Sequence, residues 1–458
     1  MNKIILSIAI ILGLILSTAS AQNTSISTIK KESKQHIITI NNFNDLVSAI
    51  QNGEKEITIA RNILCNYSVL LPAGVNLNGK PQENGELPML SFQQADGIGV
   101  SADNSVKNLN IDAPVNHKAI FNTTVQQDLG TFTLENLLVK GQVSIITRVG
   151  VGKANIMVNN VDIHSADTRH YLEQPQKYGV TVLQGALTIY NINPDTNSVV
   201  SVAVNNLSIG RKNAPVTGSG LFLSGFGDRG GKTEISKLHT KAIYANGKIP
   251  LGVADYITGG VFVLSGANAK EVITDGEVIT YGVNDMVLDV WGSVDNWTSN
   301  APIISYGPSG VGFANFGIIK NFTVNAPLQT YGMGARGYNQ YDGTIENISF
   351  QSIETFGDGS VGIQISKKIG TLTVNENVTT HGSVGSTLVK GVYVDLPAYA
   401  LSIKNGGQAK NITIKGDLAT YGDKVVSYIV EKGGNPGALT ISGKIIASGK
   451  NAQPKKIE

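Results

Sequence analysis

The sequence has few of the residues that build disulfide-stapled or highly charged proteins. Its 458 residues include one cysteine, Cys65, so no disulfide can form within the chain. Charged residues make up 15% of the chain and give a net charge of +2, and we expect no face of clustered lysine and arginine. This balance argues against nucleic acid or an anionic membrane as the partner.

Long hydrophobic runs are also scarce. The one clear run covers residues 4–16, follows Lys3 and precedes the small residues Ala19-Ser20-Ala21. This order is typical of a signal peptide, so we predict that residues 1–21 are removed on export and that residues 22–36 form a polar leader. The mature chain has no transmembrane-length segment. We therefore expect a periplasmic, extracellular or cell-surface protein.

Helical patterns are nearly absent, whereas glycine is abundant with 52 residues. Residues 42–51 place Phe43, Leu46, Val47 and Ile50 at helical spacing behind Asn42, which predicts one short helix. Elsewhere short β-rich runs alternate with turn residues. This helix is suited to cap one end of a stacked β structure.

The sequence contains a repeated tripeptide at a fixed spacing. Thr-Tyr-Gly at 280–282 returns in related form with its glycine at 307, 332, 357 and 382, a step of 25 residues, and after a step of 40 at Gly422. A fixed period of this length indicates stacked repeats.

Columns of chemically similar residues accompany the glycine. An aliphatic residue stands four positions before it, a hydroxyl residue two before it, and an apolar residue six after it; the last column is Leu288, Phe313, Tyr338, Ile363 and Leu388. Because strands alternate their faces, we expect the aliphatic and hydroxyl columns to point inward together.

These patterns predict an all-β fold, a right-handed parallel β-helix with rungs of about 25 residues. Without helices between the strands, βαβ units are excluded. We place one β-helix domain at residues 37–450, with the most regular repeats at 275–450 and a polar tail at 451–458.

One part of the repeat resembles a known family. The segments 357–363 (GDGSVGI), 370–374 (GTLTV) and 379–382 (TTHG) are similar to the rungs of bacterial autotransporter passengers within the pectin-lyase-like superfamily. The resemblance covers roughly residues 270–450 and implies the fold more than a function. Autotransporters end in a membrane barrel, and the lysine-rich tail at 451–458 lacks its aromatic pattern, so we expect no translocator barrel here.

Enzymes of that superfamily display carboxylates and a basic residue on the outer face of a parallel sheet. The motifs of polygalacturonases and pectate lyases are missing, but Arg336 departs from its column, four residues after the glycine (Met286, Val311, Val361, Ser386). An arginine there calls for a carboxylate partner or an anionic ligand. Two interpretations stay open: a catalytic or acidic-saccharide site, or a structural Arg–Asp bridge. The candidate catalytic residues are Arg336, Asp358, Asp342, Asp285 and Asp289.

Two aromatic columns are candidate carbohydrate-binding surfaces. The first consists of Tyr281, Tyr306, Tyr331, Phe356 and His381, and the second of Trp291, Phe316 and Tyr341. Each column either faces outward, where sugar rings can lie on it, or fills a corner of the core.

The polar segment 162–177, with Asp162, His164, Asp167, Arg169 and His170, is predicted to be an inserted loop. Asp and His could hold a metal there, but solvated loop residues explain the cluster equally, and we assign no metal site.

The sequence therefore predicts an exported bacterial β-helix scaffold that binds polysaccharide or a cell-surface glycan, or acts as an adhesin. Two alternatives are a polysaccharide lyase or glycoside hydrolase acting on acidic polysaccharide, and a purely structural surface protein. We expect no cofactor, except that a lyase could use calcium.

Overall fold

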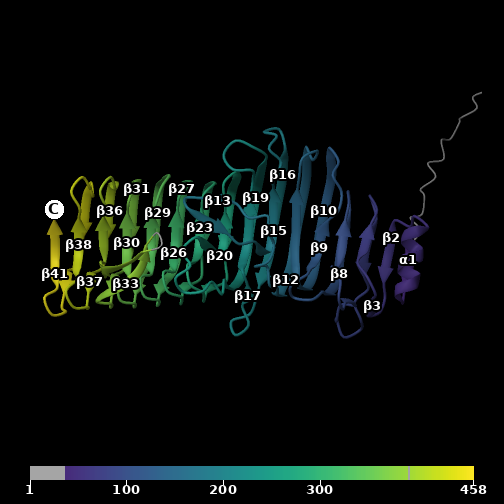
Figure 1. Ribbon diagram of the computed structural model, residues 1–458, viewed down its shortest axis with the longest axis horizontal. Coiled ribbons are helices and arrows are strands. Elements are labelled where there is room, and N and C mark those ends of the chain that lie inside the picture. The colour runs from purple at the N-terminus through teal and green to yellow at the C-terminus, as the bar shows by residue number, and fades with distance from the viewer. Residues whose placement is uncertain (1–36, 390–391) are drawn as a thin grey trace, which may run out of the picture. The chain divides into compact units, whose positions relative to one another are not determined.

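The strands of the chain stack in register into a parallel β-helix, as the repeat predicts (Figure 1). The computed structural model describes residues 37–389 and 392–458, so the predicted signal peptide and polar leader lie outside the described residues. The aliphatic column shows the stacking directly: Val278 pairs with Ile303, which pairs with Leu328, and the series continues through Ile353 and Val378. The handedness of the coil stays a prediction.

Two long parallel sheets form the walls. The first sheet begins with β1 (Ile37–Ile40), β2 (Glu56–Ile59), β3 (Ile63–Cys65), β5 (Asn76–Gly79), β6 (Met89–Phe92), β8 (Ser105–Asp112), β10 (Asp128–Lys140), β12 (Lys153–Ser165), β16 (Val199–Ile209), β17 (Val216–Thr217) and β19 (Lys232–Asn246). It continues with β21 (Ala267–Thr274), β22 (Val278–Thr280), β24 (Ser293–Ser299), β25 (Ile303–Ser305), β27 (Ile318–Thr330), β29 (Thr344–Thr355), β31 (Lys368–Val374), β32 (Val378–Thr380), β36 (Gln408–Ile414), β37 (Leu418–Thr420), β39 (Ala438–Ile441) and β40 (Ile445–Ala447).

The second sheet supplies one strand to most rungs. Its members are β4 (Val69–Leu71), β7 (Ile98–Val100), β9 (Lys118–Asn122), β11 (Gln142–Thr147), β15 (Gly185–Asn191), β18 (Ser219–Ser224), β20 (Tyr256–Val263), β23 (Asp285–Val290), β26 (Val311–Asn315), β28 (Arg336–Gln340), β30 (Val361–Ile365), β35 (Leu401–Ile403), β38 (Val426–Val430) and β41 (Gln453–Ile457). Two antiparallel hairpins of the described residues interrupt the rungs: β13 (Gln176–Lys177) with β14 (Val180–Val182), which is attached to the second sheet through β20, and β33 (Val384–Val389) with β34 (Val392–Pro397).

The single predicted helix is present as α1 (Phe43–Gln51), at the N-terminal end of the stack (Figure 1). The side chain of Asn42 accepts a hydrogen bond from the backbone N–H of Asp45 at 3.0 Å, which satisfies one of the free donors of the first turn. Phe43, Leu46 and Ala49 are buried against the first rungs. The helix thus covers apolar residues that would otherwise be exposed at this end of the solenoid.

The inward columns are as predicted. The aliphatic residues Val278, Ile303, Leu328, Ile353 and Val378 have no solvent-exposed surface. The hydroxyl column (Thr280, Ser305, Thr330, Thr355 and Thr380) is also fully buried. The hydroxyl oxygens of this column have no hydrogen-bond partner among the described residues.

The prediction was wrong where it extended the 25-residue step past Gly382. Leu388 and Ser386 do not continue the rung columns, because both lie in the hairpin of β33 and β34, opposite Tyr393 and Asp395. Ile363 pairs instead with Leu401. The hairpin accounts for the step of 40 residues, since the chain leaves the solenoid and then resumes the next rung.

The polar segment 162–177 is only partly a loop. It begins within β12, which continues to Ser165, and it ends with β13, so the loop itself is shorter than predicted. Strand β14 then joins the second sheet, because Thr181 and Val182 pair in parallel with Tyr256 and Ile257 of β20.

Candidate functional site

The first aromatic column lies on the outside of the solenoid, directly after the buried hydroxyl column. Tyr306 and Tyr331 are 41% and 37% exposed, and the column gains a sixth ring because Thr420 stacks on Thr380 and brings Tyr421 into line with His381. Of the two interpretations open from the sequence, the outward-facing one is correct. The reason is strand alternation: the neighbouring hydroxyl residue points inward, so the ring points out.

We call these six residues the aromatic ladder: Tyr281, Tyr306, Tyr331, Phe356, His381 and Tyr421. Their ring centroids are 5.4, 5.0, 4.6, 4.8 and 5.4 Å apart in order along the ladder, and successive ring planes differ by 3° to 21°. This spacing is that of hydrogen-bonded parallel strands, so each rung delivers one ring to a continuous face-to-face stack.

Polar groups border the ladder. His381 Nε2 lies 2.9 Å from Glu354 Oε1, and Gln329 Nε2 donates to Glu354 Oε2 at 3.1 Å. Partial burial raises the pKa of both Tyr281 and Tyr331, so their hydroxyls remain protonated donors at neutral pH. A sugar is apolar on its ring faces and polar at its rim. An apolar stripe bordered by hydrogen-bonding groups can contact both kinds of surface.

The second aromatic column is covered at one end by the inserted hairpin. Trp291 is buried, and Tyr178 of the insert stacks on Phe316 with ring centroids 4.5 Å apart. Phe316 in turn stacks on Tyr341 at 4.7 Å. Here the core-like interpretation holds for Trp291, because an element absent from the repeat packs over it. Tyr178 was not found from the sequence, since nothing in the insert marks it as a ladder residue.

A cleft of about 500 Å³ adjoins this second column. Its lining includes Tyr178, Phe316, Lys177, Asp228 and Asp342. Lys177 Nζ donates to both carboxylate oxygens of Asp228, at 2.9 and 3.0 Å. The cleft thus places Asp342 beside an ion pair and an aromatic wall.

Arg336 begins β28 and is half-buried. Its Nη1 donates to the carbonyl oxygen of Gly334 at 3.0 Å, and Nε has no partner among residues 37–389 and 392–458. No carboxylate oxygen of a described residue lies within 4.0 Å of this guanidinium. The Arg–Asp bridge considered from the sequence therefore does not form in the described part of the chain.

Two of the four candidate aspartates are inside the protein. Asp285 is fully buried and accepts hydrogen bonds from the hydroxyl of Thr258 and from the backbone N–H of Gly282, the latter at 2.6 Å. Burial raises the pKa of Asp285 to about 6. Asp289 is also fully buried, accepts from Trp291 Nε1 at 3.1 Å, and has its pKa raised by the same desolvation. Neither carboxyl can reach a polymer in this conformation.

The other two aspartates lie at opposite ends of β28. Asp358 precedes β30, near the start of β28, and accepts from the backbone N–H of Ser383 at 2.7 Å. Asp342 follows the end of β28, with Lys367 Nζ at 4.0 Å. Strand β28 extends from Arg336 to Gln340, roughly 13 Å, and separates Arg336 and Asp358 from Asp342, while Asp285 and Asp289 are buried; the five predicted catalytic residues therefore do not converge on one site.

Arginines hold the carboxylates of the polar insert. Asp162 accepts from both terminal nitrogens of Arg211, at 2.8 and 2.7 Å, and Asp167 pairs with Arg169 at 2.7 Å. Desolvation, together with the charge of Arg211, lowers the pKa of His164. Among the residues that the structure describes, no three His, Cys, Asp or Glu side chains are grouped so that they could hold a metal ion.

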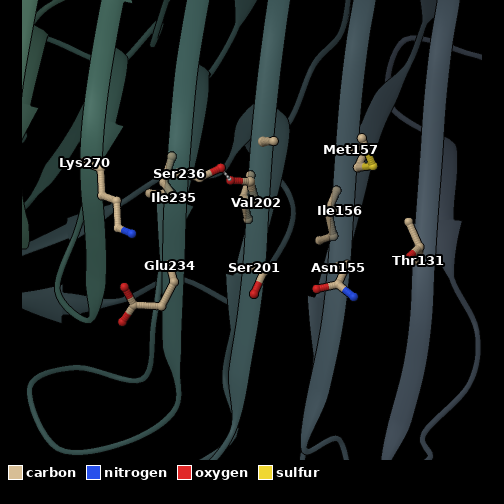
Figure 2. Close-up of a pocket in the computed structure, with 11 residues that line it drawn as sticks. Thr131, Asn155, Ile156, Met157, Ser201, Val202, Glu234, Ile235, Ser236 and Lys270 are labelled. Atoms are coloured by element: carbon tan, nitrogen blue, oxygen red, sulfur yellow. Dashed lines mark hydrogen bonds between the residues drawn. The ribbon is translucent and has the colours of Figure 1, made fainter.

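A further cleft, of about 550 Å³, lies on the outer face of the first sheet and was not anticipated from the sequence. Figure 2 shows Glu234 and Lys270 on one side, Asn155 and Met157 on the other, and the small Ser201 between them. Glu234 Oε1 accepts from Asn268 at 2.8 Å. No sequence pattern marks this cleft, because its rungs are separated by insertions of different length and its residues share no period.

Comparison with protein-family models, with curated proteins and with solved structures gave no match to this chain. No helix within the described residues is long and apolar enough to cross a membrane.

Proposed function

We propose that the protein is an exported bacterial β-helix scaffold that binds an extended polysaccharide or cell-surface glycan along the aromatic ladder. The predicted signal peptide supports export. The resemblance of residues 270–450 to autotransporter passengers supports a surface role and a place in the pectin-lyase-like superfamily. Of the functions predicted from the sequence, we propose binding, as in an adhesin. Binding needs only a surface, whereas catalysis needs catalytic groups that converge on one site.

One observation carries the proposal, namely six stacked rings in a row on the outside of the solenoid, four of them exposed and two half-buried. Apolar residues repeated on the outside of a soluble protein are a cost unless something covers them. The rings are held in place by their own rungs, so little side-chain entropy is lost when a ligand binds. Gln329 and Glu354 beside the rings supply donors and acceptors for sugar hydroxyls.

A panel of polysaccharides tests the proposal, with binding measured by affinity electrophoresis and calorimetry, with and without calcium. The double variant Tyr306→Ala/Tyr331→Ala should bind its glycan at least about tenfold more weakly, which corresponds to about 1.4 kcal/mol. Tyr256→Ala is the matched control, because Tyr256 is 37% exposed, as Tyr331 is, and lies outside the ladder. Equal binding by the ladder variant and the control, or no binding by the unaltered protein, would contradict the proposal.

A second candidate function, glycan cleavage, is favoured by the cleft in Figure 2. It combines a carboxylate, Glu234, with a basic residue, Lys270, on the outer face of a parallel sheet, which is the arrangement that the superfamily resemblance implies for a lyase. Incubation with uronate polymers should then produce the ultraviolet absorbance of unsaturated uronates, and both Glu234→Gln and Lys270→Gln should abolish it. The absence of product from every polymer would remove this candidate.

A further inference from the structure

The stacking of the aromatic ladder restricts where a sugar can lie flat on a ring. Within the ladder, each ring is within 5.4 Å of its neighbours and nearly parallel to them. The four interior rings therefore have both faces occupied by other rings and present their edges to solvent. Flat stacking of a sugar needs a free face, and only the two terminal rings, Tyr281 and Tyr421, can offer one.

The ring at the Tyr281 end of the ladder is tethered and half-buried. The hydroxyl of Tyr281 donates to the backbone carbonyl of Lys212 at 2.8 Å, and the ring is half-buried. Lys212 belongs to the turn after β16, in which Arg211 and Ala214 pair with each other. This turn thus fixes the hydroxyl of the first ring, and Asn246 stands in line with Tyr281 on the rung before, because Ala245 pairs with Thr280.

The Tyr421 end of the ladder is open. Thr420 pairs in register with Ala447, so the position next in line after Tyr421 is Ser448. Ser448 is small and exposed, and Tyr421 is 47% exposed, more than Tyr306 or Tyr331. The ladder therefore ends at a ring whose far face has only a serine beside it.

Charge distinguishes this end from the rest of the protein. Residues 401–458 hold nine lysines, no arginine and four acidic residues, a net charge of +5, whereas the whole chain carries +2. The other 400 residues therefore carry −3. The nearly balanced total therefore conceals a basic C-terminal part.

Two of these lysines lie in the turns beside Tyr421. The backbone N–H of Lys424 donates to the carbonyl of Lys450 at 2.9 Å, which places the two turns against each other. Neither side-chain nitrogen is within 4.0 Å of a carboxylate oxygen of any residue that the structure describes. The nearby Asp423 is engaged, because its Oδ1 accepts from the backbone N–H of Lys450 at 2.6 Å. Both ammonium groups are thus free to meet an anion.

We propose that Tyr421, Ser448, Lys424 and Lys450 form a terminal subsite for an anionic sugar, one that carries a carboxylate or a sulfate. The sugar ring stacks on the free face of Tyr421, and its anionic group binds the two ammonium groups. The inference rests on the proposed function, since the remaining sugars of the polymer would follow the ring edges of the aromatic ladder.

The test compares polygalacturonate with its fully methyl-esterified form, which has the same backbone without the charge. The purified protein should bind the charged polymer at least about tenfold more tightly, and the difference should shrink as salt rises. Tyr421→Ala and the double variant Lys424→Gln/Lys450→Gln should each remove this preference. Tyr306→Ala/Tyr331→Ala should weaken both polymers alike. Lys410→Gln/Lys432→Gln removes the same net charge from these rungs, in β36 and in the turn after β38, and should keep the preference.

The outcomes separate the two proposals. If Tyr421→Ala binds as the unaltered protein does while Tyr306→Ala/Tyr331→Ala is impaired, the terminal subsite is wrong and the ladder stands. If the protein binds both polymers with equal affinity, the proposal of an anionic ligand is wrong. The same conclusion follows if the Lys424/Lys450 and Lys410/Lys432 variants have equal effects. If neither these polymers nor the wider panel bind, the proposed function itself fails. Circular dichroism of each variant confirms that loss of binding is not loss of fold.

Discussion

The N-terminal and C-terminal parts of the solenoid both stack parallel strands, but the chain bends differently within their rungs. In the N-terminal part, β8, β10, β12 and β16 run through a corner at a single asparagine with φ between 51° and 56°. These residues are Asn108, Asn136, Asn160 and Asn206. In the C-terminal part the strand breaks at a short turn in some rungs, as between β21 and β22 or between β36 and β37, and in β27 and β29 it continues through the corner without an asparagine of positive φ.

The polar contacts differ as well. Each corner asparagine donates from Nδ2 to the Oδ1 of the asparagine one rung before, at 2.7 to 2.9 Å. The regular part has an asparagine column as well, because Asn347 donates to Asn321 at 3.0 Å and Asn321 to Asn296 at 2.9 Å, but it also buries a column of hydroxyls without partners among the described residues. Both parts therefore gain stability from asparagine columns, and the difference is the unsatisfied hydroxyl column of the regular part, whose stability must come from its apolar and aromatic columns. Regularity of sequence and satisfaction of polar groups are separate properties of this fold.

The largest expected effect comes from the aromatic core, which is richer in the regular part. Phe132 and Phe322 are both fully buried, and replacing either by alanine should cost about 3–5 kcal/mol of unfolding free energy. Phe322 should cost more, because its ring also stacks on Phe313 at 3.8 Å. Urea unfolding followed by circular dichroism measures both variants. A larger loss for Phe132→Ala would show that the ring stack adds little.

Asp285 joins the two parts, since it accepts hydrogen bonds from Thr258 and Gly282 on successive rungs. Its pKa is raised to about 6 from an ordinary 3.8, so the native state retains a proton that the unfolded chain has lost. The contribution of Asp285 to the free energy of unfolding should therefore be greatest below pH 4. It should fall by about 3 kcal/mol between pH 4 and 6.

Thermal and urea unfolding at several pH values check this sign. Asp285→Asn should flatten the decline between pH 4 and 6. The buried Asp289 contributes in the same direction, so a remaining slope should disappear in the double variant with Asp289→Asn. Stability that rises through this window in the unaltered protein would contradict the assignment.

The asparagine corner is sensitive at each rung. Asn136 donates to Asn108 and accepts from Asn160, and its φ of 52° disfavours alanine. Asn136→Ala should lose about 2 kcal/mol, from the hydrogen bonds and the backbone conformation together. Asn136→Gly keeps the backbone conformation accessible, so it should lose less, and the difference measures the conformational part. Indistinguishable alanine and glycine variants would mean that the hydrogen bonds dominate.

The smallest effect is expected in the hydroxyl column. Thr330 is fully buried and its hydroxyl has no partner among the described residues. Thr330→Val replaces an unsatisfied hydroxyl with a methyl group of similar shape and should change stability by less than about 1 kcal/mol, in the stabilising direction. A loss comparable to that of Asn136→Ala would indicate that the hydroxyl is hydrogen-bonded, for instance by an internal water.

The regular rungs could be predicted well from the sequence, because repeats without insertions align chemically similar residues. The inward positions of Val278 and Thr280 follow from alternation along one strand. The N-terminal rungs are equally well paired, but Leu134 stacks on Val158 and Val158 on Val204, steps of 24 and 46 residues. Insertions of unequal length hide such columns from a search for one period. The asparagine corner was missed for the same reason.

The candidate site was harder to predict, because its features depend on elements outside the repeat. The facing of the aromatic ladder follows from the neighbouring hydroxyl column, yet burial of Trp291 depends on Tyr178 of the insert. Asp285 and Asp289 were chosen for their chemistry, and sequence does not show that the surrounding chain covers them. Arg336 stands out in its column, but its partner is a backbone carbonyl.

The hairpin of β33 and β34 has a consequence for how the protein unfolds. In a solenoid each rung contacts only its neighbours, so unfolding can start at one end and advance one rung at a time. This hairpin crosses rungs: Thr387 lies beside Gly334 and 3.4 Å from the hydroxyl of Ser309, and Tyr393 lies next to Gly252. It ties rungs that are not adjacent, so this section should open as one cooperative block.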